Sequence, residues 1–200
     1  MKFIGITGGV GAGKSAVLDY IRDNYNCVIY PADNVAHLLY EKGTDCYEKI
    51  VSLLSEKILD EEGNIDKKKM AGAIFEDESL LTKINDIVHP AVREFLLNAF
   101  EEAKESGKYD FFFVEAALLI EAGYKGVVDE LWYVYADPEV RRKRLKESRG
   151  YDDAKIDSIL SNQLSDEEFR KNCDVIIDNS GELSYVYGKI DKLLEGFKGH

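Results

Sequence analysis

Glycines, a lysine and a serine follow one another near the N-terminus in a spacing that suits phosphate chemistry. The stretch Gly8-Gly9-Val10-Gly11-Ala12-Gly13-Lys14-Ser15 fits the pattern G-x4-G-K-[ST]. Glycines let backbone N–H groups close around phosphate oxygens, Lys14 adds a point charge for the β- and γ-phosphates, and Ser15 offers a hydroxyl for Mg²⁺. An apolar run precedes the stretch, and a helical pattern whose N-terminus would face the anion follows it. We therefore predict a nucleoside triphosphate site formed by Gly11, Ala12, Gly13, Lys14, Ser15 and Ala16.

Two carboxylates stand where apolar runs end. Asp33 follows the run 27–30, which Pro31 stops, and Glu115 closes the run 111–115. In open parallel α/β sheets, ligands bind at the carboxyl ends of the strands. Asp33 could therefore accept the proton of an acceptor hydroxyl, or it could only cap a helix over 34–41. Glu115 could hold Mg²⁺ or orient the acceptor, or it could only anchor the loop.

A basic run follows the fourth apolar run, 130–135. It comprises Arg141, Arg142, Lys143, Arg144, Lys146 and Arg149. Such a run is usually a solvated helix face. It also begins about one helical turn beyond a strand end, where a lid over a triphosphate would hinge, and arginine suits the charge that builds on a transferred phosphoryl group. We expect at least one of these arginines to be functional, and the pattern leaves its identity open.

The remaining pattern indicates the elements that must position these groups. Strands are predicted at 3–7, 27–30, 111–115, 130–135 and 175–177, while 44–106 shows helical spacing and no strand of the core sheet. Further helices are predicted at 152–161 and 182–197. His89-Pro90 should end or kink the long helical stretch. A lone histidine there is more often structural, and Arg93 is either a surface charge or an anion clamp. The loop 178–181 can approach an adenine through Asn179, or it is only a turn.

Composition narrows the class of protein. The 200 residues are 45% hydrophobic and carry a formal net charge of −12, which argues against a nucleic-acid or anionic-membrane surface. The three cysteines lack C-x-x-C spacing, so reduced, buried thiols are expected. The longest apolar stretch, 111–120, is about half a bilayer span, and the N-terminal run lacks the pattern of a signal peptide. We expect a cytoplasmic protein with no membrane partner, as a monomer or weak homo-oligomer.

Several segments beyond the glycine-rich loop resemble the dephospho-CoA kinase family over nearly the whole length. They are Ala32-Asp33, Ile58-Leu59 through Gly63-Asn64-Ile65-Asp66, Ile74-Phe75, His89-Pro90-Ala91-Val92-Arg93, Leu118-Leu119-Ile120-Glu121, Gln163, and Asp174 to Gly181. The resemblance implies ATP-dependent phosphorylation of the ribose 3′-hydroxyl of dephospho-CoA, the last step of coenzyme A synthesis. It implies ATP as the phosphoryl donor, Mg²⁺ as the metal and dephospho-CoA as the small-molecule partner.

The resemblance also assigns roles to residues. Catalytic roles are implied for Asp33 as the base and for Lys14, Arg144 and Arg149, and a nucleotide contact for Asn179. Substrate contacts are implied for Asp33, His37, His89, Arg93, Glu115 and Leu118, and metal contacts for Ser15 and Glu115. The implied fold is α/β, a three-layer P-loop kinase type with a five-stranded parallel sheet. It forms a single domain over 1–200, with a core at about 1–34, 107–136 and 166–200, a helical substrate-binding insert at about 35–106 and a lid at about 137–165.

The chain departs from the family pattern near the implied site. Pro31 stands where an aspartate is common, His37 where an arginine is usual, and Ser148 where a lid arginine is expected, while Glu115-Ala116-Ala117 replaces Asp-Ile-Pro. A kinase of the same architecture acting on a nucleoside monophosphate or a small alcohol is the first alternative. A nucleotide-controlled switch is the second. It is supported only by Asp60-Glu61-Glu62-Gly63, which resembles D-x-x-G but lies in a turn and lacks an accompanying N-K-x-D.

Overall fold

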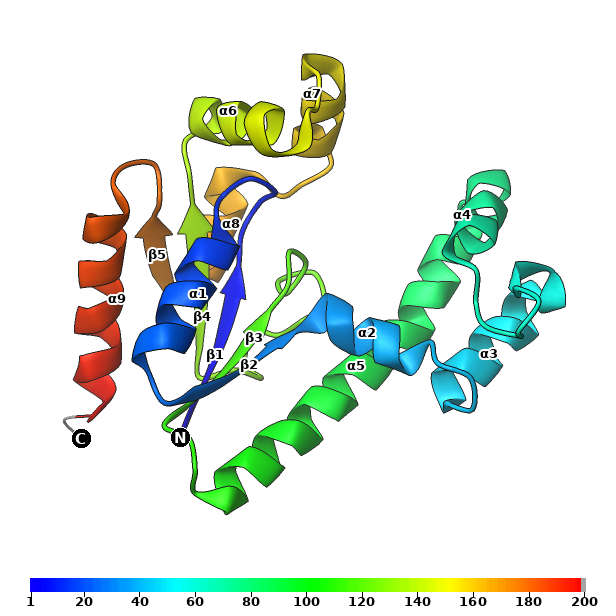
Figure 1. The fold of residues 1–200 in the computed structure, drawn as a ribbon, viewed down its shortest axis with the longest axis horizontal. Helices are drawn as coiled ribbons and strands as arrows, with labels where there is room; N and C mark the ends of the chain where they lie inside the picture. The colour runs from blue at the N-terminus through cyan, green and yellow to red at the C-terminus, as the bar shows by residue number, and fades with distance from the viewer. Residues whose placement is uncertain (199–200) are drawn as a thin grey trace. The chain divides into compact units, whose positions relative to one another are not determined.

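The computed structural model describes residues 1–198, so the last two residues of the core predicted at 166–200 lie outside it. Figure 1 shows the strands and helices in chain order. They are β1 (Lys2–Thr7), α1 (Lys14–Asn24), β2 (Cys27–Pro31), α2 (Ala32–Leu39), α3 (Asp45–Leu54), the 3-10 turn η1 (Glu56–Ile58), α4 (Lys67–Glu76), α5 (Ser79–Ser106), β3 (Phe111–Glu115), β4 (Glu130–Tyr135), α6 (Pro138–Arg149), α7 (Asp153–Ser161), α8 (Asp166–Asn172), β5 (Val175–Asp178) and α9 (Leu183–Lys198).

The strands form one sheet in the order β2-β3-β1-β4-β5. β1 pairs in parallel with β3 and β4, and β4 pairs in parallel with β5. In this register Ile6 lies opposite Glu115 and Thr7 lies opposite Tyr133, so the carboxyl ends of the three central strands are adjacent. The predicted five-stranded parallel α/β sheet is confirmed.

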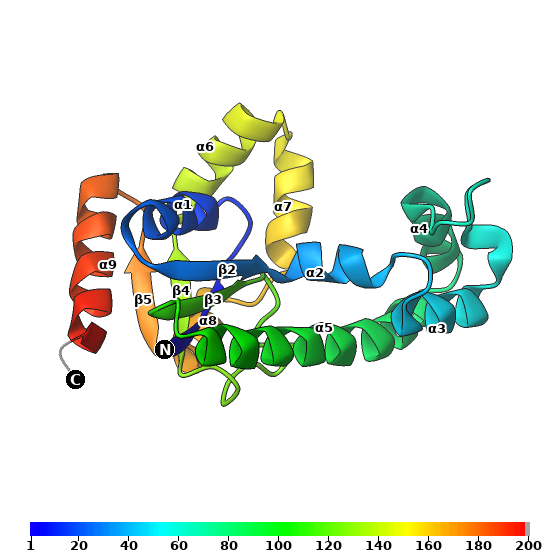
Figure 2. The same ribbon diagram turned by 60° about the horizontal axis from the view of Figure 1, so that its bottom comes forward.

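Alternate residues of β4 show how helices cover both faces of the sheet. Trp132 and Val134 are fully buried in a cluster with side chains of α1 and α9, which lie side by side in Figure 2. Tyr133 points to the other face, where its ring stacks on Phe169 of α8 at 4.5 Å between centroids. Because successive side chains of a strand point to opposite faces, one strand joins two helical layers into the predicted three-layer arrangement.

The chain divides into two compact units. The first comprises residues 1–29 and those from 103 onward, and the second comprises residues 30–102. The second unit is built from α2 to α5, and its buried side chains include Val35, Tyr47, Ile50, Ile84 and Val88. Its Asp60–Gly63 turn is closed by a bridge between Leu59 and Ile65. The assignment of 35–106 as a substrate-binding insert and of 137–165 as a lid stays a prediction.

The expectation that the helix ends at His89-Pro90 is wrong, because α5 continues through Pro90 from Ser79 to Ser106. A proline inside a helix removes one donor to the carbonyl four residues earlier. Here Pro90 and Asp86 are both exposed, so water can satisfy that carbonyl. The opposite face buries Val88, Val92 and Leu96, and this packing holds the helix together.

The three cysteines are free; Cys46 is buried, and Cys27 and Cys173 are half-buried. Burial raises the pKa of all three thiols, and at Cys173, with the neighbouring Asp174 carboxylate, it raises the pKa to about 12. Between residues 1 and 198, no helix has both the length and the apolar character needed to cross a bilayer.

Candidate active site

The glycine-rich loop joins the central strand β1 to α1. Gly8 has a φ of 147°, and a Cβ at this position would collide with the backbone oxygen of Val134 in the neighbouring strand. Gly13 has a φ of 89° and is the N-cap residue of α1. Both positions therefore require glycine, one for close approach to β4 and both for a positive φ. The loop delivers the N-terminus of α1, with its unpaired N–H groups, to the carboxyl end of the sheet.

Side chains hold the carbonyl groups of this loop. Lys14 Nζ donates to the Gly8 oxygen at 2.9 Å, and Arg141 Nε donates to the Val10 oxygen at 2.9 Å. The Ala12 oxygen accepts from Asn179 Nδ2 at 2.8 Å and from Arg144 Nη1 at 3.2 Å. These contacts fix the direction of the peptide groups in a loop that has few side chains of its own.

Asn179 connects the loop to the far end of the chain. Its backbone N–H donates to the Tyr135 oxygen at 2.7 Å, and its backbone oxygen accepts from Arg144 Nη2 at 2.9 Å. The residue is 1% exposed, yet its side-chain Oδ1 accepts no hydrogen bond from any described residue. A buried acceptor without a partner is costly, so this oxygen is a candidate acceptor for a ligand N–H.

The arginines of α6 separate onto two faces. Arg141 and Arg144 face the loop, and Arg141 also donates through Nη2 to Gln163 Oε1. Burial lowers the pKa of the Arg141 guanidinium from its ordinary value, although arginine stays charged in proteins. Figures 1 and 2 both show α6 on the side of the sheet that carries this loop.

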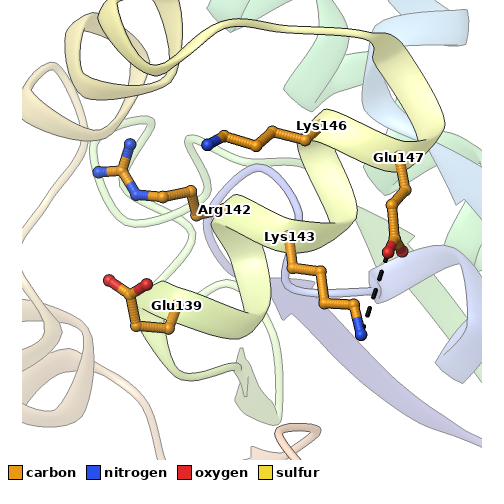
Figure 3. Close-up of a pocket in the computed structure, with 5 residues that line it drawn as sticks. All are labelled: Glu139, Arg142, Lys143, Lys146 and Glu147. Atoms are coloured by element: carbon orange, nitrogen blue, oxygen red, sulfur yellow. Dashed lines mark ion pairs between the residues drawn. The ribbon is translucent and has the colours of Figure 1, made fainter.

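The second face of α6 points to α7. Arg142 donates to Asp153 Oδ1 at 2.8 Å and to Asp157, and these hydrogen-bonded carboxylates raise its pKa. Figure 3 shows Lys146 extending from α6 in the same direction as Arg142, and its Nζ lies 2.8 Å from Asp153 Oδ1. The cations of this face thus have acidic partners, and they join α6 to α7.

Arg149 is not brought to the loop. It is the last residue of α6 and is exposed, with its guanidinium carbon 5.9 Å from the centre of the Tyr151 ring. Within residues 1–198 its guanidinium makes no hydrogen bond or ion pair. By contrast, Arg141 lies on the loop although the sequence did not single it out among the four arginines. Leu145, buried four residues later, is the sequence signal that marks this inward face of α6.

Glu115 and Lys14 form an ion pair at the end of β3. The Nζ and Oε1 atoms are 3.5 Å apart, and the two side chains are mostly buried. Ser15, the next residue of α1, is exposed. Its hydroxyl and the Glu115 carboxylate are hard oxygen donors of the kind that Mg²⁺ prefers. Among the described residues there is no cluster of three or more His, Cys, Asp or Glu side chains arranged to hold a metal ion.

Leu118 lies in the segment after β3 and is 49% exposed. It lines a small pocket of about 20 Å³ together with Gly9 of the loop and Gln163, among other residues of the first unit. Thr7, fully buried at the end of β1, donates to the Ala117 oxygen at 3.1 Å and ties this segment to the loop. The predicted substrate contact at Leu118 is thus next to the phosphate loop.

Asp33 lies in the first turn of α2, directly after β2, and is exposed. The N-cap of α2 is Pro31, and no side chain caps this helix, so the alternative that Asp33 is the cap residue is wrong. His37 follows one turn later, and its Nε2 lies 3.1 Å from Lys67 Nζ at the start of α4. His89 and Arg93 are likewise one turn apart, on α5; His89 is half-buried and Arg93 is exposed.

We expect Gly8→Ala to weaken the affinity for a nucleoside triphosphate at least tenfold, because the added Cβ would displace the loop from Val134. A positive φ alone costs an alanine about 1 kcal/mol. The effect of this backbone strain must therefore be separated from the effect of the collision with Val134. Gly126, with a φ of 88° and no atom within 4 Å of an added Cβ, provides the matched control. Calorimetric titration with ATP should show Gly126→Ala binding normally, and equal losses in both variants would contradict the collision argument.

Comparison with known proteins points to one family. A family model described as dephospho-CoA kinase matches residues 2–184. Dephospho-CoA kinase of Aquifex aeolicus is 37% identical over 98% of this chain and 97% of its own length, and that of Fusobacterium nucleatum is 35% identical over 98% of both.

Solved structures agree in fold. The structure of TT1252 from Thermus thermophilus has a TM-score of 0.79 at 26% identity, covering 98% of this chain and 97% of that one. Dephospho-CoA kinase from Campylobacter jejuni has a TM-score of 0.72 at 24% identity, with 98% of each chain covered, and supports the fold alone. The family match along residues 2–184 and the full-length relatives show that the chain belongs to the dephospho-CoA kinase family.

Proposed function

We propose that the protein transfers the γ-phosphoryl group of ATP to the ribose 3′-hydroxyl of dephospho-CoA, giving coenzyme A and ADP. The observation that carries the proposal is the loop of residues 8–15 with Arg144 and Asn179 fixed on it, in a chain of this family. Such a loop binds a triphosphate and leaves the choice of acceptor to other residues.

The donor half of the proposed site lies in the first unit. Gly11, Ala12, Gly13, Lys14, Ser15 and Ala16 would surround the phosphates, and Lys14 would reach the β- and γ-oxygens. Asn179 Oδ1 would accept a hydrogen bond from the amino group of the adenine, which would give this buried acceptor a partner. Ser15 and Glu115 would hold Mg²⁺, which would neutralise part of the negative charge of the triphosphate.

Charge on the transferring phosphoryl group requires donors that are in place before the reaction. Arg144 meets this requirement, because its guanidinium is already fixed on Ala12 and Asn179 at the loop. Arg141 has a comparable position through Val10. Arg149 can take its proposed catalytic role only by moving from Tyr151 toward the phosphates of ATP.

The acceptor half is proposed to use Asp33 as the general base. Its carboxylate is exposed and not used as a helix cap, so it can accept the proton that leaves the 3′-hydroxyl when the O–P bond forms. His37, His89, Arg93, Glu115 and Leu118 are the further proposed contacts of the acceptor.

The reaction is tested by incubating the purified protein with ATP, Mg²⁺ and dephospho-CoA and measuring ADP and coenzyme A. We expect the two products in equal amounts. AMP and other nucleoside monophosphates serve as competing acceptors, because the first alternative is a kinase acting on them. Turnover of a monophosphate equal to or faster than that of dephospho-CoA would refute the proposal.

Asp33→Asn should lower kcat for dephospho-CoA by at least a hundredfold, since the amide keeps the shape of the side chain and cannot take the proton. Binding of ATP should be unchanged in calorimetry. Asp45→Asn is the control, because Asp45 is also an exposed acid in a first helical turn, that of α3. An Asp33→Asn variant with kcat within threefold of the wild type would exclude the base role.

Arg144→Ala should reduce kcat/KM for ATP by about a hundredfold, a typical loss for a positioned donor to transition-state charge. Arg142→Ala, on the α7 side of the same helix, should lose less than threefold. Arg149→Ala distinguishes the two arginines named for catalysis. If Arg149→Ala is inactive while Arg144→Ala is nearly normal, the assignment of Arg144 is wrong.

A further inference from the structure

Lys67 and His37 form a contact that joins α4 to α2 in the second unit. The Lys67 Nζ and His37 Nε2 atoms are 3.1 Å apart. An ammonium group has three donors and no acceptor, so in this contact Lys67 donates and His37 Nε2 accepts. The pair is accessible to solvent, and the other N–H groups of the ammonium remain able to donate.

The neighbouring polar groups of α4 are engaged elsewhere. Asp66 accepts from the backbone N–H groups of Lys68 and Lys69 and caps the helix, and Lys69 Nζ donates to the Leu59 oxygen at 2.5 Å. In the described part of the chain, no carboxylate lies within ion-pair distance of Lys67. Lys67 is therefore a cation whose partner is a histidine ring and not a carboxylate, which leaves it available to an anion.

The position of Lys67 relative to Asp33 indicates which anion it could bind. Asp33 and His37 are four residues apart on α2, so they lie on one face of the helix, separated along its axis by about 6 Å. The 3′-oxygen and the 5′-phosphorus of a ribonucleotide are joined through two ring carbons, one exocyclic carbon and the 5′-oxygen, so they span a similar distance. A 3′-hydroxyl at Asp33 can therefore have its 5′-phosphate beside the His37–Lys67 pair.

We propose that Lys67, positioned by His37, binds the 5′-diphosphate of the acceptor and thereby selects a 3′-hydroxyl that belongs to a 5′-phosphorylated nucleoside. This assignment rests on the proposed function, because it takes Asp33 as the point where the acceptor hydroxyl lies. It assigns Lys67 to acceptor recognition, with no part in the chemical step.

The test is the steady-state kinetics of Lys67→Ala with dephospho-CoA and ATP. We expect KM for dephospho-CoA to rise about tenfold, the loss of one exposed charge-assisted hydrogen bond, with kcat and KM for ATP within twofold of the wild type. Lys67→Arg keeps the charge and should recover most of the affinity. Lys68→Ala is the matched control, because Lys68 is the next lysine of the same helical turn.

A double variant tests whether the two side chains act as a unit. If His37 acts through Lys67, KM for dephospho-CoA in His37→Ala/Lys67→Ala should be no higher than in Lys67→Ala alone. A KM raised by the product of the two single effects would mean that His37 makes its own contact with the acceptor, and would overturn its role in positioning Lys67. A KM for dephospho-CoA within twofold of the wild type in Lys67→Ala would overturn the assignment. So would a parallel fall in kcat that Lys67→Arg does not restore, since that pattern indicates a structural role.

The wild-type protein shows whether a negative result refutes the proposed function or only the role of Lys67. A wild-type protein that neither binds dephospho-CoA in calorimetry nor transfers phosphate to it refutes the function, and the role of Lys67 with it. Normal transfer by the wild type together with an unchanged Lys67→Ala variant refutes the role of Lys67 alone.

Discussion

A peptide group points its N–H and its C=O in opposite directions, and this constraint governs the loop between β1 and α1. A loop that offers N–H groups to an anion must find other partners for its carbonyls. Here the carbonyls of Gly8, Val10 and Ala12 accept from cationic or amide side chains. Most of those donors come from α6 and from the turn after β5, so the phosphate loop depends on segments more than a hundred residues away in sequence.

Helix α6 makes two separate sets of contacts. Arg141 and Arg144 attach the helix to the loop, while Arg142 and Lys146 attach it to α7. Exposed ion pairs contribute little stability one at a time, but the shared Asp153 makes the second contact a small network. A change on one face of α6 therefore alters the loop, and a change on the other alters the connection between the two helices.

Much of this arrangement could be predicted from the sequence, because buried parallel strands appear as continuous apolar runs and the loop has a fixed pattern of glycines. The placing of the arginines on two faces of α6 could not be predicted. The sequence does not show which side chains of a basic run face inward until the limits of α6 and the burial of Leu145 are known. The continuous α5 was missed for a related reason. The effect of Pro90 depends on whether its side of the helix meets solvent, and that depends on tertiary packing. The contact between His37 and Lys67 joins segments that no local pattern relates.

The protonated state of the cysteines has a consequence for the chemistry of the proposed acceptor. Dephospho-CoA and coenzyme A both end in a thiol, and their oxidised forms are disulfides that a protein thiolate can attack. Such exchange requires the thiolate, and burial raises the pKa of Cys27, Cys46 and Cys173 above that of an exposed thiol. Burial therefore lowers the thiolate fraction of these three cysteines at neutral pH, which slows their exchange with disulfides of the substrate or product.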